Sequence, residues 1–383
     1  MLHKIEKGMT QDGMEIALII YVVLSRGVNK MISIKIKPVI VRCNDEKDKN
    51  IEIMSLKTLE NTIKKAFKES KDYVLFSFKG DEPTLAGLNF YKQVLAIQRK
   101  YSKKKIKIMN SIQINGSCMN ENWAQFFKSE NFLVNLLVDG ELVLNEAISE
   151  ENDSEVNINK VIKAKNIMDK FSVNYNVITT ITEKTAYKAS EIYKFYKENK
   201  IMFCHFVPYV GKKESELEGE DLLLTRDGYE KFLKEFFDLW YEDYKEGNLK
   251  SVRLFENICA ILLGYEAESC ELQGCCSIQN IIDTNGNIYP CDFYDSEGDC
   301  LGNINEISFK ELNKNNYALK FISSVEPLIK CKQCKYAALC KGGCKRFKNT
   351  DTNEYYYCQT FKSFYDYTID RFIEVCKNIV NKK

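Results

Sequence analysis

Short apolar runs alternate with amphipathic stretches along the first half of the chain. The apolar runs have the length of strands, and the stretches between them repeat apolar residues at the three- and four-residue spacing of a helix. The expected strands are residues 32–41, 73–78, 106–114, 132–138, 173–181 and 202–209. The expected helices are residues 56–67, 88–101, 122–127, 158–171 and 186–196, with Ser55 as the N-cap of the first.

This order of elements predicts an α/β fold with a parallel sheet. Near-continuous apolar strands are typical of a sheet that is buried on both faces. Parallel neighbours need a crossover helix because a short hairpin cannot join them. We therefore expect about six βα units, with ligands gathering at the carboxyl ends of the strands.

After the last of these strands the pattern changes. Residues 229–244 form a strongly aromatic amphipathic helix, and residues 255–263 form another helix. An aromatic stripe at helical spacing gives a helix one apolar face, so the first of the two is expected to pack on the sheet. We place a domain boundary near residues 250–268 and divide the chain at residue 250.

Composition and charge narrow the classes of function. The 383 residues are 45% hydrophobic, enough for a sizeable core, and carry a formal net charge of +1. This balance does not favour nucleic acid or a membrane surface as a partner. His3 and His205 are the two histidines of the chain, so His-rich metal sites and Ser-His-Asp catalysis are disfavoured. Thiolate and carboxylate chemistry remain.

The N-terminal extension, residues 1–30, contains an apolar run at residues 16–24. The run is too short to cross a bilayer, its flanks mix acidic and basic residues, and no cleavage site of small residues follows it. We interpret it as a buried helix or as residues upstream of a true start at Met31. The expected location of the protein is the cytoplasm.

Cysteine is concentrated in the last third of the chain, where ten of the fifteen cysteines lie within residues 270–358. In a reducing compartment this density indicates metal or iron-sulfur ligation and not disulfides. The Asn285-Gly286 pair marks a hairpin turn that delivers a cysteine at a strand end. Eight thiolates in two spacing groups would serve two four-cysteine centres. They are Cys270, Cys276 and Cys291, then Cys331, Cys334, Cys340, Cys344 and Cys358.

Spacing does not choose between zinc and a [4Fe-4S] cluster, because both accept four thiolates. Cys275 lies beside Cys276 and competes for its place. The other cysteines lack a partner at ligand spacing and are expected to act as small buried hydrophobes. They are Cys118, Cys204, Cys259, Cys300 and Cys376.

Longer motifs in a fixed order carry a family resemblance. They closely resemble the SPASM region and the barrel of radical-SAM peptide-modifying enzymes, above all the anaerobic sulfatase-maturating enzymes. The matching segments are residues 76–87 (FSFKGDEPTLAG), 110–116 (NSIQING), 289–294 (YPCDFY), 301–304 (LGNI) and 331–344, followed by Cys358. The resemblance covers about residues 34–375.

The resemblance implies an architecture and a set of cofactors. Residues 31–250 would form a partial (β/α)6 radical-SAM barrel, and residues 251–383 a cysteine-rich SPASM domain with a C-terminal helix. The family uses SAM, a catalytic [4Fe-4S] cluster and two auxiliary [4Fe-4S] clusters. The first auxiliary cluster would take Cys270, Cys276, Cys291 and Cys344, and the second Cys331, Cys334, Cys340 and Cys358.

The same resemblance implies a reaction and partners. In these enzymes a Cys or Ser side chain of a sulfatase is oxidised to formylglycine, and the extra electron leaves through the auxiliary clusters. Asp292 falls on the proposed base for the substrate side chain. The implied partners are a sulfatase-like protein or peptide and a redox donor such as a ferredoxin or flavodoxin.

The sequence departs from the family where the SAM cluster would bind. The family's CxxxCxxC loop is reduced to Cys43, and its second and third cysteines are absent. The family's Gln-Gly-Gly-Glu-Pro segment reads Lys-Gly-Asp-Glu-Pro at residues 79–83, so Asp81 adds a negative charge beside the SAM carboxylate. The expected remnant of the SAM site is Gly80, Glu82 and Pro83, with Glu82 holding its loop through backbone contacts.

A further departure comes after the fourth strand. The family's Ser, His and Arg are replaced by Leu137, Asn145 and Ser149, so a hydroxyl and the cation that pairs with SAM are missing. Losses at several places that share one ligand suggest relaxed selection on SAM binding.

These residues leave three hypotheses. The first is a pseudoenzyme that keeps two auxiliary clusters, cannot cleave SAM alone, and serves as a peptide-binding, electron-relay or partner subunit, for example of a related active enzyme. The second is an active sulfatase maturase whose cluster loop is lost from the sequence through a deletion or a faulty gene model. The third is a structural zinc protein on the same scaffold. Asp292 is then either a base or a cap of the next turn.

Overall fold

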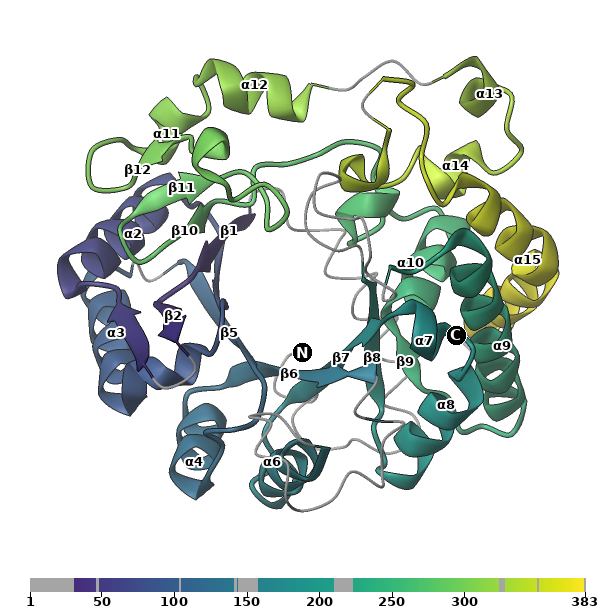
Figure 1. Cartoon of the computed structure of the whole chain (residues 1–383), viewed down its shortest axis with the longest axis horizontal. Helices are drawn as coiled ribbons and strands as arrows, with labels where there is room; N and C mark the ends of the chain where they lie inside the picture. Colours follow the sequence, from purple (N-terminus) through teal and green to yellow (C-terminus); the bar gives the residue numbers. More distant parts are fainter. Residues whose placement is uncertain are drawn as a thin grey trace.

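The computed structural model describes residues 31–45, 48–102, 105–140, 143, 158–209, 223–323, 328–349 and 351–381. The N-terminal extension at residues 1–30, and the substituted positions Asn145 and Ser149, lie outside these residues. In Figure 1 the sheet curves into a partial ring, and helices cover its outer face.

One sheet runs through the molecule. Its strands are β1 (Met31–Ile36), β4 (Tyr73–Phe78), β5 (Lys107–Ile114), β6 (Phe132–Asp139), β7 (Tyr175–Ile181), β8 (Phe203–Pro208), β9 (Ser251–Val252), β10 (Ile281–Ile282), β11 (Asn287–Tyr289) and β12 (Gly302–Asn303). The order is β12-β11-β10-β1-β4-β5-β6-β7-β8-β9. All neighbours from β10 to β9 are parallel, whereas β11 is antiparallel to both β10 and β12. The predicted parallel sheet is confirmed.

Helices connect the strands and shield one face of the sheet. They are α2 (Leu56–Glu69), α3 (Gly87–Tyr101), α4 (Glu121–Ser129), α6 (Ile158–Lys170), α7 (Glu183–Ala186), α8 (Ala189–Glu198), α9 (Arg226–Lys245), α10 (Arg253–Leu262) and α15 (Cys358–Asn381). The predicted N-cap is present, because the Ser55 side chain accepts a hydrogen bond from the Thr58 amide at 3.1 Å.

The strands divide their side chains between a packed face and an inner face. In β4, Val74, Phe76 and Phe78 are fully buried against the helices. Residues between them face the other way, and there Ser111 Oγ on β5 donates to Ser77 Oγ at 2.9 Å. Because side chains alternate along a strand, the inner face of the barrel carries polar groups that the core does not use.

The aromatic helix packs on the barrel, as predicted. In α9, Phe236 and Phe237 are fully buried. The ring of Phe236 lies 4.5 Å from that of Phe206 on β8, and the ring of Phe237 lies 4.7 Å from that of Phe372 on α15. These contacts tie the last helix of the chain to the barrel wall.

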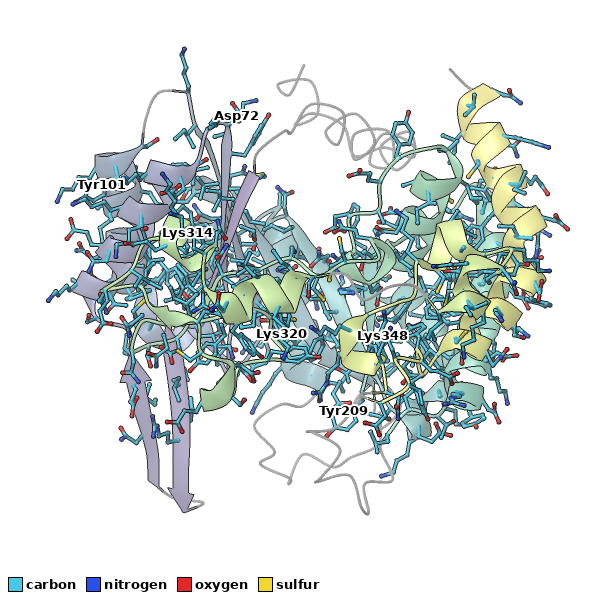
Figure 2. All side chains as sticks on the ribbon, turned by 90° about the horizontal axis from the view of Figure 1, so that it is seen from above. Asp72, Tyr101, Tyr209, Lys314, Lys320 and Lys348 are labelled. Carbon is cyan, nitrogen blue, oxygen red and sulfur yellow. The ribbon has the colours of Figure 1, made fainter. Side chains whose placement is uncertain are left out.

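Two predicted elements are wrong in detail. The strand expected over residues 32–41 breaks at Lys37-Pro38, because proline has no amide hydrogen to continue the ladder. After the break the chain forms a separate antiparallel hairpin, β2 (Val39–Asp45) and β3 (Asp48–Ile53). Figure 2 shows it as the two long purple strands that project from the barrel. The helix expected over residues 186–196 is two helices, α7 and α8.

The sheet also crosses the division expected at residue 250. β9 extends one edge, and β10, β11 and β12 extend the other, so residues 31–250 and 251–383 contribute to a single sheet. The predicted Asn285-Gly286 hairpin is present between β10 and β11, with φ +89° at Gly286. Within the described residues, no helix is long and apolar enough to cross a membrane.

Candidate functional site

The first group of thiols is assembled from four separate segments. Cys270 begins the short helix η4 (Cys270–Leu272), Cys276 lies in the loop after it, Cys291 follows β11, and Cys344 precedes η6 (Lys345–Phe347). Burial raises the pKa of Cys344 to about 12, and the neighbouring thiolates of Cys270 and Cys291 contribute to this rise. The pKa of Cys276 is raised by burial and by Cys291. The four thiols therefore share one electrostatic environment.

The second group comes from the last part of the chain. Its thiols lie in α13 (Ile329–Lys332), in the turn after it, at the end of α14 (Ala337–Cys340) and at the start of α15, and they are Cys331, Cys334, Cys340 and Cys358. Burial raises the pKa of Cys340 to about 11, and the other three thiolates contribute. Among the eight thiols, these mutual effects on the pKa fall within the two groups that the resemblance implies, and Cys275 also raises the pKa of Cys276. Their assignment to clusters remains a prediction.

No three of the His, Cys, Asp and Glu side chains in the described ranges converge on a point where one metal ion would sit. In a [4Fe-4S] cluster each thiolate binds a different iron, so four thiolates around a cluster stand further apart than four around one ion. The geometric finding therefore concerns a single-ion site.

A tight turn separates Cys340 of the second group from Cys344 of the first. Lys341, Gly342 and Gly343 all have positive φ, at +47°, +90° and +67°. A Cβ atom at Gly343 would lie 2.5 Å from the ring of Tyr355, so the backbone there approaches a buried aromatic side chain too closely for any other residue. This turn directs Cys340 to one group and Cys344 to the other.

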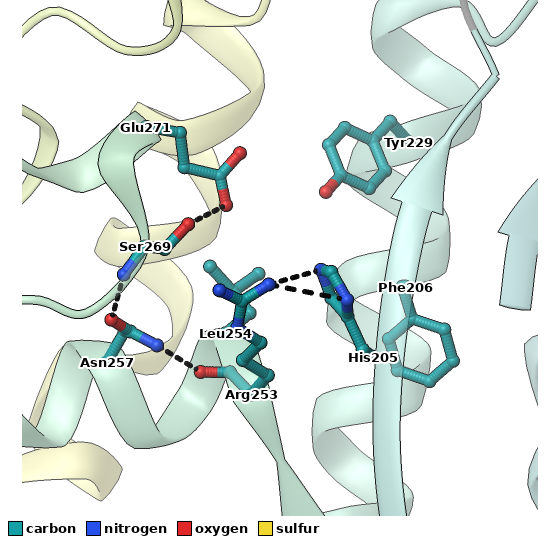
Figure 3. A pocket seen from close by; sticks show the side chains of 8 residues that line it. All are labelled: His205, Phe206, Tyr229, Arg253, Leu254, Asn257, Ser269 and Glu271. Atoms are coloured by element: carbon teal, nitrogen blue, oxygen red, sulfur yellow. Dashed lines mark hydrogen bonds between the residues drawn. The ribbon is translucent and has the colours of Figure 1, made fainter. Parts of the chain in front are cut away.

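A polar network fixes the loop that carries Cys270. The Asn257 side chain accepts hydrogen bonds from the amides of Glu268 and Ser269 at 2.7 and 2.9 Å. Arg253 on α10 binds the Glu268 carboxylate through two hydrogen bonds of 2.8 Å. In Figure 3 the Arg253 guanidinium also faces the His205 ring on β8. Burial and the Arg253 charge lower the pKa of His205 to about 3, so this histidine is neutral at physiological pH.

The predicted SAM-site remnant is engaged by the protein itself. Gly80 has φ +121°, which favours glycine, and a Cβ atom there would lie 3.4 Å from the Val39 carbonyl oxygen and 3.6 Å from Lys37 Cβ. The Glu82 carboxylate is buried and accepts hydrogen bonds from the amides of Thr84 at 3.1 Å and Asn115 at 2.9 Å. These are the backbone contacts expected of Glu82, and burial raises its pKa.

The rest of the same segment shows this pattern too. Pro83 begins the short helix η2 (Pro83–Ala86), and its carbonyl accepts a hydrogen bond from the buried Tyr91 hydroxyl at 2.9 Å. The Asp81 carboxylate accepts a hydrogen bond from the amide of Val41 in β2 at 2.8 Å. The residue that departs from the family segment thus binds the hairpin that comes after β1.

Asp292 lies at the centre of an ion-pair cluster. Its Oδ2 is 2.5 Å from the Nζ atoms of both Lys35 and Lys79. Burial works to raise the pKa of Asp292, but the two cations outweigh it and hold this pKa below the ordinary value. Burial lowers the pKa of Lys79 to about 8 against the attraction of Asp292. Within the described residues, Asp292 Oδ1 is buried and has no hydrogen-bond partner. One alternative expected the Asp292 carboxylate to cap the next turn, and it does not do so among the described residues.

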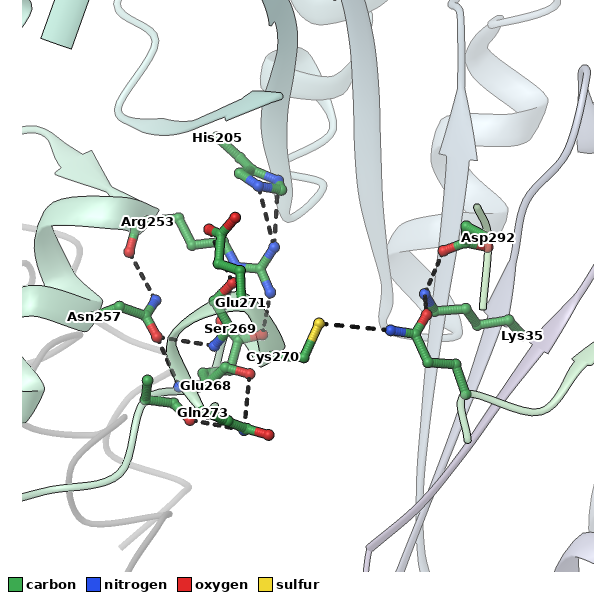
Figure 4. A network of polar contacts seen from close by, with 12 residues as sticks. Lys35, His205, Arg253, Asn257, Glu268, Ser269, Cys270, Glu271, Gln273 and Asp292 are labelled. Atoms are coloured by element: carbon green, nitrogen blue, oxygen red, sulfur yellow. Dashed lines mark hydrogen bonds and ion pairs between the residues drawn. The ribbon is translucent and has the colours of Figure 1, made fainter. Parts of the chain in front are cut away.

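Reasoning from sequence missed Lys35 and Gln279, and it noted Lys79 only as a replacement of the family's Gln. Lys35 donates to the side-chain carbonyl of Gln279, whose amide nitrogen faces Cys270 Sγ at 3.8 Å (Figure 4). Alternation along β1 was the available signal, because buried Ile34 and Ile36 leave Lys35 on the inner face of the barrel. Gln279 gave no such signal, since its partner lies 244 positions away.

Comparison with known proteins agrees with this geometry. No protein-family model matches the chain. A cysteine-type anaerobic sulfatase-maturating enzyme of Clostridium novyi is 35% identical over 346 residues, which is 89% of this chain and 92% of that protein. A serine-type enzyme of Bacteroides thetaiotaomicron is 24% identical over 366 residues, covering 89% of this chain and 87% of that protein.

Solved structures show the same likeness. Native anSMEcpe with bound AdoMet and Kp18Cys peptide superposes with a TM-score of 0.84 at 35% identity, covering 91% of this chain and all of that one. Streptococcus suis SuiB bound to the precursor peptide SuiA has a TM-score of 0.57 at 16% identity, covering 90% of this chain and 79% of that one, and shares the fold alone.

The partial barrel with a cysteine-rich C-terminal region is the architecture of a radical-SAM protein with a SPASM extension. The 35% identity to the Clostridium novyi enzyme, over most of both chains, identifies the family within this class. The chain belongs to the family of anaerobic sulfatase-maturating enzymes.

Proposed function

We propose that this chain is a member of the family that binds a peptide and two auxiliary [4Fe-4S] clusters but does not cleave SAM alone. It would act as a peptide-binding or electron-relay partner, for example of a related active enzyme. The observation that carries the proposal is the hairpin β2–β3, which comes after β1 where the family has its cluster loop, and which is bound by Asp81.

The hairpin gives the region after β1 a different use. Val39 to Cys43 in β2 pair with Lys49 to Ile53 in β3 as a regular antiparallel ladder. Three thiolates are needed to hold the catalytic cluster, and Cys43 is the one cysteine of this segment. The residues present therefore do not fit that cluster, and we derive no step through SAM.

The contact of Asp81 supports this against a simple loss of the loop. A deletion or a faulty gene model would remove ligands, but it would not supply a carboxylate that accepts a hydrogen bond from the new hairpin. This hydrogen bond is charge-assisted and lies at an exposed position, so it marks a local fit more than a large stabilisation. The substituted residue Asp81 thus makes a specific contact with β2, as expected if this segment has evolved together with the hairpin.

The thiol groups support the cluster part of the proposal. Cys270, Cys276, Cys291 and Cys344 would hold the first auxiliary cluster, and Cys331, Cys334, Cys340 and Cys358 the second. When bound, such clusters accept and release single electrons. Within each set, neighbouring thiolates raise the pKa of a member, Cys340 in one and Cys344 in the other, which supports their proximity.

Asp292 supports the peptide part of the proposal. A solved relative, native anSMEcpe, holds the Kp18Cys peptide together with AdoMet. Here Asp292 Oδ1 is buried without a partner among the described residues, and a buried acceptor of this kind favours a ligand that supplies a hydrogen-bond donor. The Cys or Ser side chain of a peptide would be such a donor. Lys35 and Lys79 lower the pKa of Asp292 and so weaken it as a base, which favours this hydrogen bond over proton abstraction.

The test is anaerobic purification and iron reconstitution of the full chain, followed by iron counting, EPR and a SAM-cleavage assay. We expect a brown protein with about eight iron atoms per chain, two cluster signals and no 5′-deoxyadenosine. Production of 5′-deoxyadenosine would favour the active-enzyme hypothesis. A colourless protein with about two zinc ions per chain would favour the structural zinc hypothesis.

Binding of a Cys-containing peptide is tested separately on the iron-loaded protein. We expect binding by the unaltered chain and weaker binding by the Asp292→Ala variant, with Asp295→Ala as the matched control. Asp295 pairs with Lys37 at 2.5 Å but is more exposed. Equal binding by all three proteins would contradict the role proposed for Asp292.

A further inference from the structure

The Gln279 side chain joins the barrel to the first group of thiols. It lies in the segment between Cys276 and β10, and its backbone amide donates to the Pro290 carbonyl at 2.8 Å, next to Cys291. Its Oε1 accepts a hydrogen bond from Lys35 Nζ, and its Nε2 faces Cys270 Sγ at 3.8 Å. Figure 4 shows this line of contacts crossing from β1 to the Cys270 loop.

The orientation of the amide is set by its partner. A lysine ammonium donates and never accepts, so the atom of Gln279 that meets Lys35 must be the oxygen. The nitrogen is then directed at the Cys270 sulfur, and an exchange of the two atoms would place N–H groups against the ammonium. Lys35 therefore orients the hydrogen bond that Gln279 offers to the thiolate.

The Lys35 ammonium also lies near two of the thiols. Its Nζ donates to Gln279, whose Nε2 faces Cys270 Sγ at 3.8 Å. The ammonium is held in place by Asp292, whose backbone follows Cys291 directly. Lys35 thus lies between two of the ligands expected for the first auxiliary cluster, with its side chain 22% exposed.

We propose that Lys35 and Gln279 act as positioning residues that raise the reduction potential of the first auxiliary cluster. This inference rests on the proposed cluster ligands. One electron added to a cluster adds one negative charge, which a nearby cation and an N–H group directed at a ligand sulfur stabilise. The second cluster, whose ligands lie in α13, α14, α15 and the turn between the first two, has other neighbours, including Lys330, which precedes Cys331 in α13.

The test is a redox titration followed by EPR on the iron-loaded full chain. We expect the Lys35→Met and Gln279→Leu variants to shift the midpoint potential of the first cluster to lower values, while the second cluster in the same sample keeps its potential. Lys35→Arg keeps the positive charge, so the midpoint potential of its first cluster should stay close to that of the unaltered chain. Lys330→Met is the crossed control, and it should lower the midpoint potential of the second cluster alone.

The outcomes separate this inference from the proposed function. Two clusters whose potentials do not respond to Lys35→Met and Gln279→Leu, or respond equally, would overturn the role of these residues and leave the cluster assignment standing. Failure of the unaltered chain to take up iron would overturn the assignment and the inference together. Iron content and circular dichroism of each variant show that a shift is not due to a lost cluster or an unfolded chain.

Discussion

The two regions that hold cofactors in this family differ in what their residues contact in this chain. Around the loop after β1, the residues that correspond to the SAM site now contact the protein itself, as Asp81 contacts Val41 and Glu82 contacts Asn115. In the C-terminal region, eight thiols lie at the spacing that the family resemblance assigns to two clusters. The proposed function treats the two regions separately: the scaffold would lose the ligand of one site and keep the thiols of another site on the same sheet.

Iron content tests this comparison most strongly. We expect Cys291→Ser to lose about four iron atoms per chain, since one missing thiolate opens one cluster, and Cys334→Ser to lose a similar number from the other. Cys43→Ser should lose none. The measurement is iron per chain after anaerobic reconstitution, and a loss of iron from the Cys43 variant would break the distinction between the regions.

The next largest effect is expected on protein stability, from a substitution in the glycine turn between Cys340 and Cys344. Gly343→Ala introduces a Cβ atom 2.5 Å from the Tyr355 ring at a backbone φ of +67°, and we expect it to destabilise the protein by roughly 1–3 kcal/mol. The control is Gly298→Ala, because a Cβ there meets nothing within 4 Å. Urea unfolding measures the difference. Equal stability of the two variants would mean that the turn tolerates a side chain.

The free energy of unfolding should depend on pH through His205, which contacts Arg253 in the network that holds the Cys270 loop. The folded-state pKa of His205 is lowered to about 3, so between pH 3 and 6.5 the unfolded chain binds a proton that the folded chain does not. Stability therefore falls on acidification, by about 1 kcal/mol between pH 7 and pH 5.5. Unfolding curves of His205→Gln should lack this part of the decrease, whereas those of His3→Gln should retain it.

The smallest effect is expected from Asp81, whose carboxylate holds the β2–β3 hairpin through the Val41 amide. Asp81→Ala removes the acceptor for the Val41 amide at an exposed position, and we expect a loss of about 1 kcal/mol or less. Asp81→Asn keeps an acceptor oxygen and should lose less. Faster hydrogen exchange at Val41 in the Ala variant measures the local opening. Unchanged exchange would show that the hairpin is held by other contacts.

Much of the fold could be predicted from the sequence because its signals are local. The apolar runs indicated the parallel strands, and the Asn285-Gly286 pair indicated the hairpin between β10 and β11. The break at Pro38 was visible as a residue, but the alternation on both sides of it favoured one long strand. The new hairpin partner, β3, lies in a charged segment whose period is weak.

The candidate site was predictable in part for the same reason. The spacing of the cysteines is a local pattern, and it indicated the two thiol groups. The contacts of Asp292 with Lys35 and Lys79 join residues more than 200 positions apart, so they depend on how the sheet closes and not on any motif. The replacement of the family's Gln by Lys79 was visible, but its ion pair was not.

The parallel pairing of β1 with β10 has a consequence for how the chain folds during synthesis. Lys35 and Ile36 lie opposite Ile281 and Ile282, so one edge of β1 keeps its ladder groups unpaired until residues from the last third of the chain have been made. An unpaired strand edge is a template for pairing with other chains. Contacts over such sequence separations also form slowly. The nascent protein therefore passes through a long interval in which its first strand must be protected, and a chaperone that binds extended segments would meet it there.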